Sequence, residues 1–418
     1  MFTPRFAFRR RDAIRSFAVI TLCKVALFLV LAKSGYVEPY VGGSAANYYL
    51  PTAASIVSTG AIGDADTLAR RTKISPGYPI FLALTEWIGG RWYLFVLVAA
   101  QMALDCGVAI LLFLLGSWET SVGAGWLAGV LWLVFPPAVV ISTWVASETL
   151  ATALLTLSIV MLIRSLSRQR AVALSFATGI SLGITTLVRA TTQLLPVVLL
   201  VLSAVDPRQR RRLTYLLIFA GMCLMIAPWT LRNLYVVREP IIIQTGYGPL
   251  FLMGSRSEYF TIDGVQRDYL NLQQRAEEAG LVRPTDGRVT SEDRWIFRLG
   301  VREYRLRLKE EPLSFVPFLL HKFARLWYGT ETGATGKQIT LGICSILTAP
   351  IGLYQIWRWR KDRPQLSLIA GFFCVYFMAL LMVNLPALRY MLPVFPLLIF
   401  AASHQYLKIA SRRMATAD

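Results

Sequence analysis

Three acidic residues in this sequence could act as a general base or hold a divalent cation. Glu148, in "STWVASETLATALL", stands at the start of a long apolar segment, and Asp64 and Asp66 lie in the stretch "GAIGDADTLARR". A carboxylate at the edge of an apolar segment is costly unless it is paired or used, so it marks a functional site by default. Ser147 and Glu148 could equally cap the N-terminus of a helix, and the two aspartates could be solvated turn residues.

Three arginines lie at the ends of apolar segments and could bind phosphate. They are Arg189 in "LVRATTQLLP", Arg232 in "PWTLRNLY" and Arg389 in "LPALRYMLPVFP". The planar guanidinium group can contact two phosphate oxygens at once. Any one of them could instead extend its charge towards the membrane surface, but three arginines on one face favour a phosphate clamp.

The remaining charged residues and motifs narrow the chemistry. Lys24 and Asp105 stand at similar depth in two apolar segments, which predicts an ion pair within the membrane. The sequence contains no Walker, GxGxxG, HExxH, GxSxG or CxxC motif. This excludes the common nucleotide-binding, metallopeptidase and hydrolase classes.

The composition is that of a protein that crosses a membrane many times. Of the 418 residues, 55% are hydrophobic and 16% are charged, and the mean hydropathy is +0.53. Segments near the length of about 20 residues that spans the hydrocarbon core predict an all-α protein with about ten transmembrane helices. They lie at 15–33, 92–116, 121–140, 146–164, 171–188, 193–205, 213–231, 339–357, 367–384 and 389–407.

Clusters of basic residues predict how these segments are oriented. They precede the first span, follow the fourth, sixth and eighth, and close the chain. An even number of spans puts all of them on one side, so the positive-inside rule predicts that both termini are cytoplasmic. The net charge of +19 then reflects topology, and nucleic acid is excluded as a partner.

Two long segments fall on the opposite, extracytoplasmic side. The first, residues 34–91, should form interfacial helices at 50–59 and 76–90, because each run is apolar but too short to cross. The second, residues 234–337, should form a small cap with helices near 267–280 and 291–310 and an amphipathic helix at 312–329. The chain thus divides into an N-terminal transmembrane module (1–233), the cap (234–337) and C-terminal transmembrane helices with a short tail (338–418).

Six sequence elements, in order along the chain, resemble those of bacterial GT-C superfamily integral-membrane glycosyltransferases. This family includes protein O-mannosyltransferases (glycosyltransferase family 39) and the aminoarabinose transferase that acts on lipid A. The elements are Tyr49–x3–Ala53–x6–Gly60 with "SPGYPIFLAL" (75–84), "ASETL" (146–150), "GITTLVRAT" (183–191), "APWTLRNLYVV" (227–237), "PIIIQTGYGPLFLMG" (240–254) and "LRYMLPVFPLLIFAA" (388–402).

The resemblance implies transfer of a sugar from a polyprenyl-phosphate donor to an extracytoplasmic lipid, glycan or protein, usually with inversion. It implies that Arg189, Arg232 and Arg389 contact the donor phosphate and that Glu148, Asp64 and Asp66 are candidate bases or metal ligands. The substrate would contact Asn47, Tyr49, Tyr78 and Asn233. A divalent metal, Mg²⁺ or Mn²⁺, is left open. The implied location is the bacterial inner membrane, among membrane lipids, with the active face towards the periplasm.

One departure from the family pattern affects the predicted chemistry. The family carries an acidic residue four positions before the tyrosine of the first element, and here that position is Ala45. A placed carboxylate is the simplest base for the acceptor hydroxyl. Two hypotheses therefore stand side by side: an enzyme whose acid lies elsewhere, and a degenerate protein that binds or moves a glycolipid. A secondary transporter is a third, without the internal repeat typical of that class.

Overall fold

The computed structural model describes most of the chain, and every regular element in the described part is a helix. This confirms the predicted all-α class. The aspartates Asp64 and Asp66, and most of the helix predicted at 267–280, lie outside the described residues. The described residues are 10–35, 38–42, 45–62, 72–167, 171–205, 209–261, 271, 274, 276–278, 280–330 and 335–415.

All ten predicted spans correspond to apolar helices. In the described part, seven helices are long and apolar enough to cross a membrane, and three shorter apolar helices occupy the other predicted spans. The long helices include α1 (Arg10–Lys33), α5 (Tyr93–Glu119), α8 (Glu148–Ser167), α11 (Gln209–Val236), α16 (Thr335–Asp362), α17 (Pro364–Val383) and α19 (Phe395–Ala415). The shorter ones include α6 (Val122–Leu133), α9 (Val172–Val188) and α10 (Leu195–Val205). The protein is therefore a multi-pass membrane protein.

The predicted third span, 121–140, is not one continuous helix. It is divided into α6 and a short α7 (Pro136–Ile141). Pro136 and Pro137 open α7, where a missing N–H is harmless, but proline cannot continue a preceding helix. The chain consequently turns at Phe135, whose backbone is extended.

Two further helix breaks hold residues that the sequence singles out. Helix α9 ends at Val188, and Arg189 is extended with φ −150° and ψ 115° before a 3₁₀ turn leads into α10. The last span likewise opens with the four-residue α18 (Leu388–Met391) and a 3₁₀ turn before α19. Each of these two arginines, Arg189 and Arg389, therefore lies at an interruption rather than along a helix.

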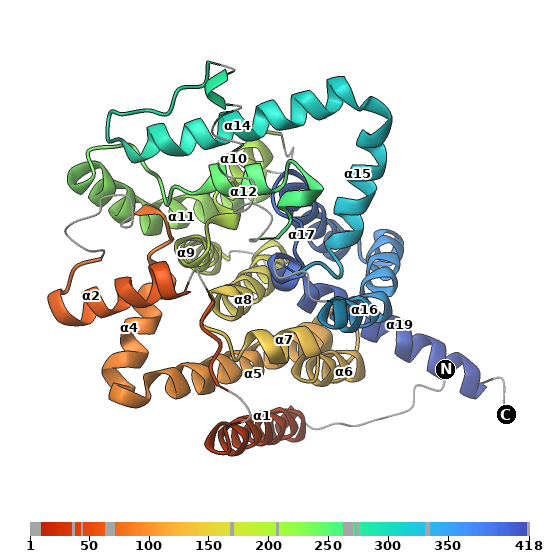
Figure 1. Cartoon of the computed structure of the whole chain (residues 1–418). Coiled ribbons are helices and arrows are strands. Elements are labelled where there is room, and N and C mark those ends of the chain that lie inside the picture. The colour runs from red at the N-terminus through yellow and green to blue at the C-terminus, as the bar shows by residue number, and fades with distance from the viewer. Residues whose placement is uncertain are drawn as a thin grey trace.

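Shorter helices cover one end of the bundle. The first long loop contains a π-helical turn (Ala45–Tyr49), α2 (Leu50–Thr59) and α4 (Gly77–Gly89). The second segment contains α12 (Tyr247–Met253), α14 (Val289–Glu310) and α15 (Pro312–Arg325). In Figure 1 several spanning helices are seen end-on while α14 and α15 lie in the plane of the view. This confirms the helices predicted at 50–59, 76–90, 291–310 and 312–329.

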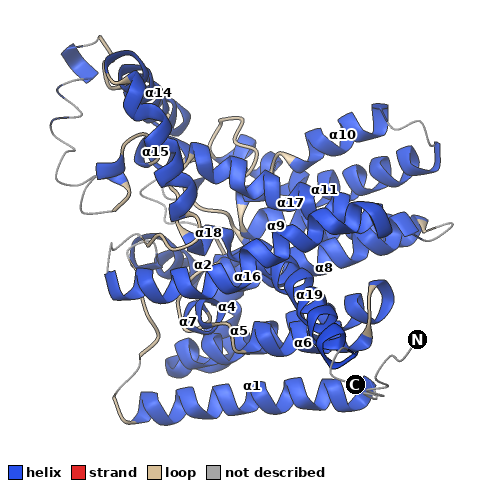
Figure 2. Ribbon diagram, turned by 90° about the vertical axis from the view of Figure 1, so that its right-hand side faces the viewer, coloured by secondary structure: helices blue, strands red, loops and turns tan. Residues whose placement is uncertain are grey.

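The described part of the chain begins and ends at the same end of the bundle. Figure 2 shows the N-terminal end of α1 and the C-terminal end of α19 at the same end of the bundle, as an even number of crossings requires. That this end faces the cytoplasm remains a prediction from the basic clusters.

Two contacts between helices, an ion pair and a close glycine packing, stabilise the interior of the bundle. Lys24 Nζ lies 3.4 Å from Asp105 Oδ2, with side-chain exposures of 12% and 2%, which confirms the predicted ion pair between α1 and α5. Helices α9 and α11 meet at glycines: a Cβ on Gly179 would lie 2.1 Å from the carbonyl oxygen of Ile218. Small residues let membrane helices approach closely enough for backbone contact.

We predict that Gly179→Ala lowers the midpoint of thermal unfolding in detergent by several degrees. The added methyl group must push α9 from α11, and overpacking of this kind costs about 1–3 kcal/mol. Gly107→Ala on α5 is the matched control, because a Cβ there meets no atom within 4 Å. Equal midpoints for the two variants would contradict the close packing of α9 on α11.

Candidate active site around Glu148

Two arginines from distant parts of the chain converge on one buried carboxylate. Arg189 Nη1 lies 3.0 Å from Glu148 Oε1, and Arg389 Nε lies 3.5 Å from the same oxygen. The side chain of Glu148 is 3% exposed, while those of Arg189 and Arg389 are 12% and 23% exposed. The three residues come from the start of α8, the break after α9 and the short α18.

Hydrogen bonds fix the turn before α8, from which the side chain of Glu148 extends. Gln101, fully buried on α5, donates from its amide to the carbonyl oxygens of Ser142 and Trp144, each at 2.9 Å. Tyr40 pairs with the same turn through backbone hydrogen bonds to Thr143 and Val145. The turn connecting α7 and α8 is thus held both from the bundle and from the first loop.

Ser147 links the arginines to the first loop. Its hydroxyl accepts a 3.0 Å hydrogen bond from Arg189 Nη1 and lies 3.5 Å from the Tyr49 hydroxyl. Its carbonyl oxygen accepts the first helical bond of α8, from Ala151. The proposed Ser147–Glu148 helix cap is therefore only partly observed, because both side chains are directed to Arg189.

A tyrosine orients both guanidinium groups. Arg189 and Arg389 each lie 4.8 Å from the ring centroid of Tyr390, and Arg389 Nη2 donates to the Tyr390 hydroxyl at 2.8 Å. Cations favour the face of an aromatic ring. The buried Nε of Arg189 has no hydrogen-bond partner, so this side chain retains capacity to bind an anion.

Among the described residues, one carboxylate of low exposure faces two guanidinium groups. Two guanidinium groups held together in this way favour an anion such as a phosphate. Glu148 itself is a poor general base here, because two guanidinium groups compete with any proton for its oxygen.

The predicted substrate residues of the first loop divide between two places. The rings of Tyr49 and Tyr78 meet edge to face at 4.9 Å, and the Tyr78 hydroxyl donates to Gln101 at 3.4 Å. Burial raises the pKa of the Tyr49 phenol, and the nearby Glu148 carboxylate raises it further. Tyr49 therefore stays protonated beside the cluster.

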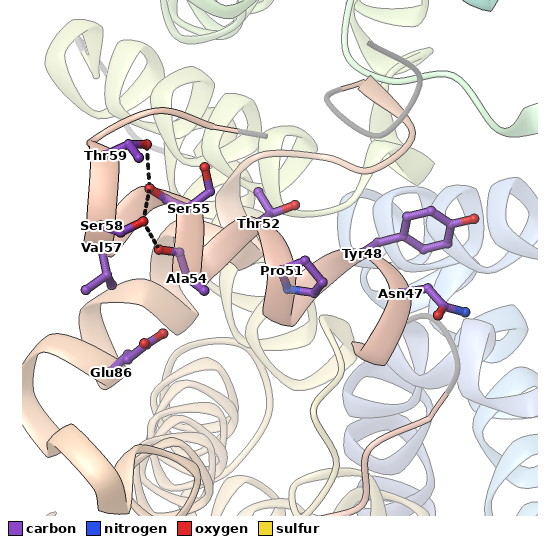
Figure 3. A pocket seen from close by; sticks show the side chains of 10 residues that line it. All are labelled: Asn47, Tyr48, Pro51, Thr52, Ala54, Ser55, Val57, Ser58, Thr59 and Glu86. Atoms are coloured by element: carbon purple, nitrogen blue, oxygen red, sulfur yellow. Dashed lines mark hydrogen bonds between the residues drawn. The ribbon is translucent and has the colours of Figure 1, made fainter. Parts of the chain in front are cut away.

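Asn47 lies at a separate pocket along α2. This cavity of about 480 Å³ is also lined by Tyr48, several hydroxyl side chains and the carboxylate of Glu86 (Figure 3). The hydroxyls of Ser58 and Thr59 donate to backbone carbonyls of α2, so they face a ligand mainly as acceptors. The pocket suits a polar ligand with hydrogen-bond donors.

Arg232 and Asn233 make their described contacts elsewhere. Arg232 donates from Nη2 to the carbonyl oxygen of Ile62 at 2.8 Å and lies over the Trp229 ring. Ile62 is the last described residue before the stretch with Asp64 and Asp66. The fully buried Asn233 bonds with Arg232 and with the Ile241 carbonyl. The described contacts thus join Arg189 and Arg389, and a phosphate role for Arg232 stays a prediction.

Ala45 lies where no carboxylate would be solvated. It is 2% exposed within an apolar cluster that includes Tyr78, Leu150 and Ala151. The described residues also contain no group of three or more His, Cys, Asp or Glu side chains that could hold a metal ion. Glu148, already bound by two cations, does not fit Mg²⁺ or Mn²⁺ by itself.

Sequence reasoning missed two supporting residues, Gln101 and Tyr390, and it named Ser147 only as a possible helix cap. Gln101, Ser147 and Tyr390 carry no charge, and only the last two stand beside predicted site residues. A polar residue inside an apolar span, as Gln101 is, was the available signal.

We predict that Glu148→Gln destabilises the protein by about 3–5 kcal/mol, because it leaves two buried guanidinium groups without their counter-charge. Thermal unfolding in detergent measures this loss. The double variant Glu148→Gln/Arg189→Gln should recover part of it, while Glu310→Gln at the exposed end of α14 should change stability by less than about 0.5 kcal/mol. A Glu148→Gln protein as stable as Glu310→Gln would show that the ion cluster contributes nothing.

The fold is similar to that of a solved archaeal oligosaccharyltransferase, although no family model and no curated protein matches the sequence. The archaeal oligosaccharyltransferase AglB from Archaeoglobus fulgidus, with an inhibitory peptide and a dolichol-phosphate, superposes with a TM-score of 0.59 and 14% identity. The match covers 99% of this chain and 52% of that chain. The same enzyme tethered to an acceptor peptide gives 0.59 and 15%, covering 98% and 51%.

A structure of ArnT from Cupriavidus metallidurans is also similar, with a TM-score of 0.40 and 13% identity over 94% of this chain and 77% of that chain. The present chain spans about half the length of the oligosaccharyltransferase chains that it matches. At such low identity the likeness concerns the fold alone. The chain is a polytopic membrane protein whose fold is similar to that of the archaeal oligosaccharyltransferase AglB.

Proposed function

We propose that this protein is a GT-C-type glycosyltransferase that transfers a sugar from a polyprenyl-phosphate donor to an acceptor outside the cytoplasm. The observation that carries the proposal is the pair Arg189 and Arg389 held on Glu148. The cluster brings two guanidinium groups together, and the buried Nε of Arg189 has no hydrogen-bond partner, which suits a phosphate group. The bound dolichol-phosphate of the AglB structure supports a lipid-phosphate ligand for this fold.

In the proposed reaction the acceptor oxygen attacks the anomeric carbon of the sugar. A bond forms between these two atoms as the bond from the anomeric carbon to the phosphate oxygen breaks, with inversion. The electron pair leaves with the polyprenyl phosphate, whose growing negative charge Arg189 and Arg389 stabilise. Charges fixed before the reaction lower the barrier because they need no reorganisation.

Glu148 positions these arginines rather than taking the proton. Its oxygen is engaged by both guanidinium groups, and removing it would release them. The proton of the acceptor hydroxyl passes to another base, for which Asp64 and Asp66 of the first loop are our candidates. Arg232, bonded to Ile62 at the edge of that loop, would help to hold the loop in place.

A second function is favoured by one specific observation, the burial of Ala45 among apolar side chains. A protein with this fold but no base would bind or move a glycolipid without transferring its sugar. Fold alone does not decide between these functions, so an assay of sugar transfer is needed to decide.

We predict that Arg389→Gln and Arg189→Gln each lower kcat/KM for sugar transfer by about 10²–10³, because each removes charge from the leaving phosphate. The assay follows labelled sugar from a panel of polyprenyl-phosphate donors into membrane acceptors. Arg294→Gln, on the exposed side of α14, is the control and should transfer as the parent does. Unchanged transfer in both site variants would refute the phosphate role.

A panel of carboxylate variants separates the two functions. We expect Asp64→Asn or Asp66→Asn to abolish transfer, and Ala45→Asp to leave it no higher than in the parent, because a carboxylate at 45 would be buried without a partner. Ala45→Asn controls for size. A silent parent that gains transfer through Ala45→Asp would establish the degenerate function instead.

A further inference from the structure

Helix α15 directs its apolar side chains outward and its basic side chains inward, the reverse of a helix on a water-exposed surface. Its outward residues are apolar: Leu313 is 93% exposed, Val316 60%, Leu320 64% and Phe323 44%. Spacings of three and four residues place them along one stripe. The sequence predicts an interfacial helix with apolar and basic faces, and the structure shows which face points outward.

The outward stripe continues a surface that faces lipid. Helix α15 contacts the spanning helix α17, which in turn packs against α16. The neighbouring α16 exposes Ile339, Ile343 and Ile346. An apolar surface continuous with the exposed faces of spans is a surface for acyl chains, so α15 lies at the depth where lipid head groups begin.

The inward side of α15 is basic. Lys322 is fully buried and Arg325 is 7% exposed, and Arg307 reaches the same place from α14. The three cations surround two stacked rings: Arg307 lies 4.1 Å and Lys322 5.6 Å from the Phe318 centroid, and Arg325 lies 5.1 Å from that of Phe260.

These three charges have no carboxylate partner among the described residues. Lys322 Nζ donates to the Gly254 carbonyl at 2.7 Å and to the Tyr304 hydroxyl at 2.6 Å, both neutral groups. Arg325 donates to the Thr330 carbonyl, and the buried Nε atoms of Arg307 and Arg325 have no hydrogen-bond partner. The nearby Glu303 is paired with Arg256. Buried cations without a counter-charge are costly, so these side chains favour a bound anion.

We propose that Arg307 and Arg325, with the charge of Lys322 beneath them, form a binding site for a phosphate group carried by a membrane lipid. The guanidinium groups provide the hydrogen-bond donors that phosphate oxygens accept. The apolar stripe on the other side of α15 places the site at head-group depth, which favours a lipid over a free ion.

This site is distinct from the donor-phosphate contacts at Arg189 and Arg389, yet it is joined to them. The turn after α15 accepts a 3.0 Å backbone hydrogen bond at Gly329 from Leu388, the residue before Arg389. Occupation of the α15 site would therefore stabilise the backbone that positions Arg389. The proposal does not depend on sugar transfer and is tested by binding alone.

The experiment titrates short-chain phosphatidic acid onto the detergent-solubilised full chain and counts bound lipid by native mass spectrometry. Arg389→Gln serves as the background, so that the other phosphate contact is weakened in every sample. We expect Arg307→Gln and Arg325→Gln to weaken binding at least about tenfold, as loss of a charge-assisted contact does. Lys309→Gln, an exposed cation on the same helix as Arg307, is the matched control and should bind as the background does.

Equal binding by all variants, or equal weakening by Lys309→Gln, would overturn the site. Arg307→Gln should disturb folding least, because Arg307 is only partly buried. The midpoint of thermal unfolding establishes whether each variant is folded. Phosphatidylcholine should not compete. Competition by inorganic phosphate at the same concentration as the lipid would overturn the assignment to a lipid.

The pH dependence gives an independent reading of Lys322. Burial lowers the pKa of Lys322 from 10.5 to about 7, and a bound phosphate favours its protonated form. For this titration phosphatidylglycerol replaces phosphatidic acid, because the charge of its phosphodiester is constant in the range. Its affinity should fall about three- to tenfold as pH rises from about 7.5 to 9.5, and Lys322→Arg should abolish the slope. The charged or titratable groups near Lys322 are Arg256, Glu303, Tyr304, Arg307, His321 and Arg325. Burial keeps the pKa of His321 below 6.5, so this side chain stays neutral over the whole pH range. A parent without this slope would exclude Lys322 from the site.

Discussion

The structure depends on a cluster of buried charged side chains. One carboxylate, Glu148, holds two guanidinium groups that would repel each other without it, and each of the three side chains is at least three-quarters buried. The attraction between such charges is strong at low dielectric, but so is the penalty for removing any one of them. The positions of α8, α9 and α18 are therefore coupled, and two guanidinium groups at their meeting point are held in place for an anion.

Interrupted helices make this coupling geometrically accessible. Arg189 follows the last residue of α9 in an extended conformation, and Arg389 lies on a four-residue helix between two interruptions. A residue inside a continuous span would point along one helix face, whereas a residue at a break can be directed across the bundle. The same device is common where membrane proteins bind polar ligands, because the freed backbone groups need partners that the site supplies.

Much of the fold follows from the sequence, and the reasons for the exceptions are physical. Apolar length predicts where the apolar helices lie, seven of which are long enough to cross a membrane in the described part of the chain. Equal depth predicts the pairing of Lys24 with Asp105. The break at Pro136 falls inside one apolar run, so hydropathy does not reveal it. The sequence predicts that Arg189, Arg232 and Arg389 lie on one face, and the described contacts join Arg189 with Arg389 only. Glu148 as their common partner requires tertiary contacts. The inward direction of Lys322 and Arg325 reverses the usual expectation for basic residues near a membrane surface, because α15 meets lipid with its other face. Asp64 and Asp66 remain predictions.

The Lys24–Asp105 pair also has a consequence for how the protein is made. Helix α1 emerges from the ribosome well before α5, and most of its apolar surface faces outward in the finished structure. A lysine at the centre of an isolated span opposes its insertion by about 2.5–3.5 kcal/mol. Until Asp105 arrives some eighty residues later, α1 carries this penalty alone. The pair therefore favours the docking of α1 on α5 once both helices are in the membrane.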